Sequence, residues 1–170
     1  MSKFTFSKSS STTTQSPVAI KDGVHVAVIV QVAHVGLQLA FDREKAPEEQ
    51  LAVTFELASG DTVTKRMKFS DHPHSGCFAL FNAAFADPSE TDNPEPGLAD
   101  LLGKPVLIEI EVRDGKWPRV TEVLALEDGF EPIEPKSELL EFDADEMDSE
   151  VYKKLHRDIR ALVSKRVRSS

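Results

Sequence analysis

Basic and aromatic side chains are the residues of this sequence whose types and spacing best suit ligand binding. Residues 65–68, Lys-Arg-Met-Lys, form its densest basic cluster before residue 126, and Trp117 follows an Asp114-Gly115 pair typical of a tight turn. Cations neutralise phosphates, and an aromatic ring stacks on a base for about 1–3 kcal/mol, so the two together suit a single nucleic-acid strand. The alternative is that the cluster is a solvated strand face and that Trp117 caps the core.

A histidine-containing segment is the second candidate for chemistry. His72 and His74 lie close to Asp71 and Cys77, and these residue types bind zinc. Their spacing matches no common zinc-ligand pattern, and Pro73 favours a loop. We therefore predict no metal site and no cofactor.

Two further histidines, His25 and His34, fall on a predicted strand, where we interpret them as surface residues. The sequence contains no nucleophile elbow, no glycine-rich phosphate loop and no HExxH helix. Cys77 falls at the start of a predicted helix, where a thiol pKa can be lowered, yet a core position beside Phe78 is the commoner outcome. We predict that the protein is not an enzyme and has no catalytic residues.

Cysteine usage and hydropathy bear on the compartment. A single cysteine excludes an intrachain disulfide, which favours a reducing cytoplasm. No apolar run approaches the roughly 20 residues that span a bilayer, and the N-terminus lacks the apolar core of a signal peptide. We expect a soluble, cytoplasmic protein with no membrane partner.

Charge divides the chain into three blocks that sum to a net −9. Residues 1–126 carry 12 Lys/Arg against 17 Asp/Glu, a net −5; residues 127–150 carry 1 against 11, a net −10; residues 151–170 carry 7 against 1, a net +6. Such a polarised tail is typical of a partner-binding segment.

Alternating apolar residues predict five strands. The first runs from Val24 to about Ala40, with Gly36 suited to a bulge or bend. The others cover about residues 51–57, 63–69, 105–112 and 119–126. Lys65 falls at an inward-facing position of the third strand, so either it sits at a frayed barrel end or the register is off by one.

Apolar spacing also predicts helices. Three phenylalanines at i, i+3 and i+7, Phe78, Phe81 and Phe85, define one face of a helix over residues 75–86. A short helical turn is expected at residues 98–102. From Glu150 a basic helix follows, capped by Asp148 or Ser149, with an apolar stripe of Val151, Leu155, Ile159 and Leu162.

The resulting order, β-β-β-α-β-β, is that of the OB-fold. We predict a mainly β protein: a five-stranded OB-fold-like barrel with one helix between strands 3 and 4, plus a C-terminal helix. An SH3-like barrel is the nearest alternative. The predicted domains are a disordered Ser/Thr-rich arm (1–18), the OB-like barrel (19–126), an acidic linker (127–150) and a basic amphipathic helix (151–170). The interleaved acids and apolar residues of the linker are typical of a peptide that binds a groove or lies along its own barrel.

An OB barrel binds its ligand in a cationic groove across strands 2 and 3, flanked by the loops that join strands 1–2 and 4–5. These elements supply the predicted nucleic-acid-binding residues, which are Phe41, Arg43, Lys45, Lys65, Arg66, Lys68, Lys116, Trp117 and Arg119.

Two segments carry a resemblance to a known family: LLGKPVLIEIEVRDGKWPRVTEV at residues 101–123 and SELLEFDADEMDSEVYKKL at residues 137–155. They resemble motifs of bacteriophage single-stranded DNA-binding proteins of the OB type. That resemblance covers roughly residues 20–168. It implies sequence-tolerant binding of single-stranded DNA in phage replication or recombination, and a location in the host cytoplasm.

The leading hypothesis is therefore a single-stranded DNA-binding protein. Its tail would cover the groove, recruit a replication or recombination protein, or pair with another copy in a homo-oligomer. The alternative is an OB-fold protein–protein adaptor without DNA affinity, which the net −5 of residues 1–126 favours.

Overall fold

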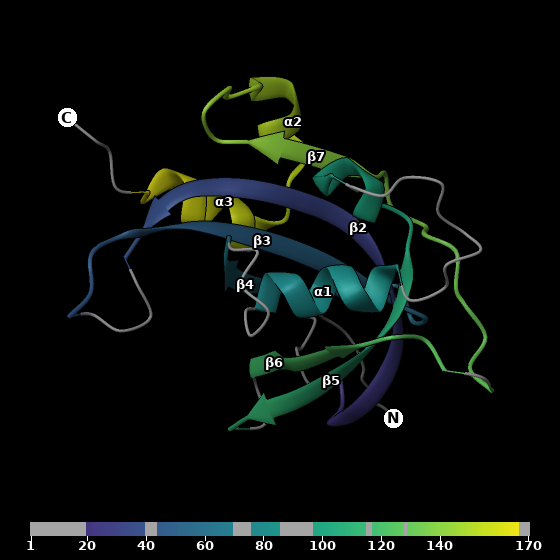
Figure 1. The fold of residues 1–170 in the computed structure, drawn as a ribbon. Helices are drawn as coiled ribbons and strands as arrows, with labels where there is room; N and C mark the ends of the chain where they lie inside the picture. The colour runs from purple at the N-terminus through teal and green to yellow at the C-terminus, as the bar shows by residue number, and fades with distance from the viewer. Residues whose placement is uncertain are drawn as a thin grey trace, which may run out of the picture.

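One mixed sheet organises the part of the chain that the structure describes. The computed structural model describes residues 20–39, 44–69, 76–85, 97–114, 117–127 and 129–166. Its strands pair in the order β4-β3-β2-β5-β6, with β7 added to β2. The strands are β2 Gly23–Gln38, β3 Glu48–Leu57, β4 Thr62–Lys68, β5 Pro105–Arg113, β6 Trp117–Leu124 and β7 Leu140–Asp143. The helices are α1 Gly76–Ala84, the 3₁₀ turn η4 Leu98–Leu101, α2 Ser149–Lys154 and α3 Arg157–Ser164 (Figure 1).

The long strand β2 joins all parts of the sheet. One edge pairs with β3, and the other pairs first with β5 and then, in parallel, with β7. The register with β3 shifts between His34 and Gly36, and Gly36 has a φ of +80°. A side chain would strain this left-handed backbone, so glycine permits the bend. The predicted irregularity at Gly36, a bulge or a bend, is confirmed as a register shift.

Alternate residues of β2 and β3 face two separate apolar clusters. Val32 and Val53 belong to the main core, whereas Ala33 and Ala52 belong to a second cluster under the C-terminal segment. Adjacent strand residues point to opposite faces of a sheet. Both faces of β2 and β3 are therefore covered, which explains their nearly continuous burial.

Helix α1 lies between the β3–β4 and β5–β6 parts of the sheet (Figure 1). It forms where a helix is predicted, between β4 and β5, but its buried face is different. Cys77, Leu80 and Ala83 are buried, whereas Phe78 is 37% exposed. Phe81 and Phe85 are partly buried and pack against the main core. The expectation that Cys77 lies in the core is confirmed.

Within the segment predicted as an acidic linker, residues 140–143 form strand β7 and pair with β2. The buried carboxylate of Glu56, 1% exposed, also accepts hydrogen bonds from the Lys136 amide, at 2.7 Å, and from the Ser137 hydroxyl. This segment therefore lies along its own sheet, which was one of the two alternatives that the sequence left open.

The single helix predicted from Glu150 is instead two short helices. Leu155 and His156 adopt extended backbone between α2 and α3, and the His156 amide donates to the Gln31 side chain at 2.8 Å. Leu155 and Ile159, which flank the break, are both buried in the second apolar cluster. Asp148 caps α2 as predicted, by accepting from two backbone amides.

Closure of the sheet into the expected five-stranded barrel is not observed. In the described chain, β4 and β6 are the two end strands of the sheet path, and no ladder joins them. They are bridged by the Lys65 ammonium, which donates to the Val120 carbonyl at 3.0 Å. Within the described ranges, no helix is long and apolar enough to cross a bilayer.

Candidate nucleic-acid interface

A groove occupies the seam between strands β4 and β6. Its volume is about 560 Å³, and we call it the seam groove. It is lined by Thr64, Lys65, Arg66, Met67, Lys68, Gly76, Pro118, Arg119 and Val120. Four of the nine predicted nucleic-acid-binding residues therefore meet in one groove: Lys65, Arg66, Lys68 and Arg119.

A hydrogen bond across the seam holds Lys65 in place. It is half-buried, and its ammonium donates to Val120 across the seam. Burial lowers the pKa of Lys65 below its usual range, and the positive charge of Arg119 lowers it further. The side chain of Lys65 points inward as predicted, and it bridges two strands that do not pair with each other.

The remaining predicted residues are not brought to the groove by any described contact. Phe41, Arg43 and Lys116 lie outside the described residues, as does the side chain of Trp117. Lys45 is exposed in the turn before β3 and is not among the groove-lining residues. The histidines predicted not to bind metal, His72 and His74, also lie outside the described part.

The outer face of β2 and β3 is covered by residues 140–164, which we call the C-terminal module. Its strand β7 and helix α3 bury Phe142, Ile159 and Val163 against Ala33 and Ala52. An OB groove was expected to cross β3 and β4. The β3 half of that face is occupied by the module, and the cations instead line the free edge of β4.

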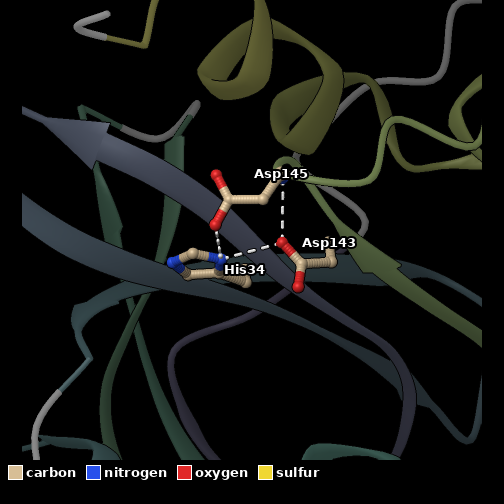
Figure 2. A group of neighbouring side chains, drawn as sticks. All are labelled: His34, Asp143 and Asp145. Carbon is tan, nitrogen blue, oxygen red and sulfur yellow. Dashed lines mark hydrogen bonds and ion pairs between the residues drawn. The ribbon is translucent and has the colours of Figure 1, made fainter. Parts of the chain in front are cut away.

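A cluster around His34 fastens this module to the sheet. The His34 ring is 12% exposed, and its Nδ1 donates to Asp143 on β7 at 3.0 Å while its Nε2 donates to Glu49 on β3 at 2.5 Å. Figure 2 shows the ring turned toward the carboxylates of Asp143 and Asp145. We call His34, Glu49 and Asp143 the His34 clamp.

Charge in the clamp favours the protonated ring. Burial disfavours the charged imidazolium, but the hydrogen bonds and charges of Asp143 and Glu49 outweigh it and raise the pKa of His34 above its usual value. The possible metal ligands His34, Asp143 and Asp145 lie within 4.8 Å of one another. Because both ring nitrogens donate to carboxylates, we interpret the group as an ion-paired contact between strands. The expectation that His34 is a surface residue is wrong.

No protein-family model matches this sequence, and no curated protein matches it either. The function must therefore be argued from the site.

The sequence pattern identified the basic strand β4 but missed the clamp. Asp143 lies 109 residues after His34, and none of the three clamp residues stands in a motif that predicts the contact. The one local indication was the Asp143-Ala144-Asp145 spacing, which places two carboxylates near each other after a strand.

Proposed function

We propose that this protein binds single-stranded DNA in the seam groove, by phosphate neutralisation and with little sequence preference. The observation that carries the proposal is the meeting of Lys65, Arg66, Lys68 and Arg119 in one groove of an acidic protein with a net charge of −9. We interpret the sheet as an OB-like barrel with an open seam. On the resemblance to phage proteins, we assign the binding to replication or recombination.

Electrostatics supports an anionic ligand. Burial lowers the pKa of Lys65, and the positive charge of Arg119 lowers it further. The repulsion between these two cations costs free energy in the empty groove. A bound phosphate would offset that repulsion, so the groove gains more from an anion than isolated surface cations would. Its openness along the seam suits an extended polynucleotide.

A protein–protein adaptor is the second candidate, because β4 and β6 end the sheet path and an added strand could pair with either edge. Two features oppose it. Pro118 removes a backbone hydrogen-bond donor from β6, and β4 carries cationic side chains along its length. Each of these features protects a sheet edge from pairing with another strand.

Fluorescence anisotropy with labelled oligo-dT at low salt tests the proposal. With four cations in contact, the plot of log affinity against log salt should have a slope of about −3. Lys68→Ala and Arg119→Ala should each weaken binding and reduce the slope by about 0.7. Lys65 is left intact because it bridges the seam.

Two matched controls lie outside the groove: Lys153 on α2 and Arg113 on β5, with side chains 70% and 58% exposed. Their alanine variants should bind like the unmodified protein. Absence of salt-sensitive binding, or equal losses in all four variants, would contradict the proposal. Edge protection alone predicts that Lys68→Ala and Arg119→Ala promote self-association without changing DNA affinity.

A further inference from the structure

A second hollow continues the seam groove on the other side of β4. It has a volume of about 260 Å³ and is lined by Thr64, Arg66, Asp158, Ala161, Leu162 and Lys165. Thr64 and Arg66 line both hollows. The surface is therefore hollowed from β6, across the edge strand β4, to helix α3.

Helix α3 is held firmly enough to form a wall. Ile159 and Val163 are 0% and 1% exposed, packed in the cluster on the outer face of β2 and β3. The Tyr152 hydroxyl lies 2.8 Å from the Ser164 hydroxyl and bonds the Arg160 carbonyl, which ties α2 to the end of α3. The C-terminal basic block is therefore not a free tail between residues 157 and 164.

The charges of this wall have opposite signs along its length. Lys165 caps the C-terminal end of α3 and is exposed, so its ammonium can reach a ligand in the hollow. Asp158 lies in the first turn of α3, within 3.9 Å of the Arg157 side chain. A phosphate in the hollow would be attracted by Arg66 and Lys165 and repelled by Asp158.

We propose that α3 is the second wall of the DNA path, so that the strand leaves the seam groove across β4 and Lys165 binds a further phosphate beside Arg66. This inference rests on the proposed function. Asp158 weakens binding in the same hollow and helps to fix where the phosphate sits. The C-terminal module thus contributes to the DNA site as well as covering the sheet.

Oligonucleotide length separates the two hollows. With a long oligo-dT of about 15 nucleotides, within the range of sites on OB folds, Lys165→Ala should lower affinity about two- to fivefold and reduce the salt slope by about 0.7. With an oligo-dT of about 4 nucleotides that fills only the seam groove, the same variant should bind unchanged. Asp158→Asn should strengthen binding of the long oligonucleotide.

Lys153→Ala on α2 is the matched control, since it removes an exposed lysine of the C-terminal module that lines neither hollow. Thermal unfolding of each variant checks that the fold is retained. If Lys165→Ala and Asp158→Asn leave long-oligonucleotide binding unchanged while Arg119→Ala weakens it, this inference is overturned and the seam groove stands. If no variant or unmodified protein binds oligo-dT, the proposed function fails and the inference fails with it.

Discussion

Replacing His34 by glutamine would test how the C-terminal module is fastened to the sheet. The imidazolium donates to Asp143 and Glu49, whose side chains are 42% and 48% exposed. A hydrogen bond to a charged group contributes about 1.5–3 kcal/mol when shielded from water. Because both carboxylates are nearly half exposed, we discount each bond to about 1 kcal/mol. Glutamine can donate to only one of them at full strength, so we expect a loss of about 1–2 kcal/mol.

The loss in the free energy of unfolding should be larger at mildly acidic pH than at alkaline pH. His34 has a pKa raised above 6.5 in the folded protein, so its contribution is complete below 6.5 and disappears as the pH rises through the raised value. Burial would raise the pKa of Asp143, but the hydrogen bond from His34, the Asp145 amide and the charge of His34 together lower it below 3.8. Its contribution is therefore complete above 3.8 and is lost as the pH falls through the lowered value. The clamp should stabilise the protein most between 3.8 and 6.5.

Urea unfolding of the wild type and of His34→Gln across this range measures the difference. The gap in the free energy of unfolding should be about 1–2 kcal/mol near pH 5 and should shrink toward pH 9. His25→Gln is the matched control, because His25 lies on the same strand but, among the described residues, bonds the Lys21 carbonyl and no carboxylate. A gap that is independent of pH, or that grows as the pH rises, would refute the protonated clamp.

Two other substitutions probe the fold around the module. Ile159→Ala removes a side chain with 0% exposure from the second apolar cluster, so the free energy of unfolding measured in urea should fall by about 2–5 kcal/mol. The control Met147→Ala, at a side chain that is 42% exposed, should lower it far less. Equal losses in the two variants would show that α3 is not packed as described. Gly36→Ala places a Cβ on a backbone with a φ of +80°, at 3.1 Å from the Arg166 side chain. The substitution should therefore lower the free energy of unfolding by about 1–2 kcal/mol. An unchanged midpoint of urea unfolding would contradict the strained backbone at this position.

Local patterns were enough to predict strands β2 to β6 and the short helical turn η4. The alternation in β2 and the need for glycine at Gly36 depend only on neighbouring residues, as does the cap at Asp148. Lys65 is informative because its inward position conflicted with its charge, and the structure resolves the conflict by a hydrogen bond to Val120 across the seam. A residue that violates the strand pattern thus marked the place where the sheet is not closed.

Long-range pairings could not be predicted in the same way. Strand β7 is a four-residue segment, and its parallel partner β2 lies over 100 residues earlier. Nothing in its composition distinguishes a short acidic strand from a solvated linker. The break between α2 and α3 could not be predicted either, because the His156 amide at the break donates to the side chain of Gln31, which is distant in the sequence. Such partners become visible only after the chain has folded.

The position of the C-terminal module explains why the cations gather at the sheet edge. Ala33 and Ala52 on the outer face are small, and small side chains let β7 and α3 lie close over β2 and β3. Because the module covers that face, the free edge of β4 is the part of the described sheet that lies open between the seam and α3. Arg66 of β4 lines the hollows on both sides of this edge. The same contacts that bury the module therefore set the course of the proposed DNA path. Weakening the module should consequently affect long-oligonucleotide binding more than short-oligonucleotide binding, since only the longer strand would reach α3.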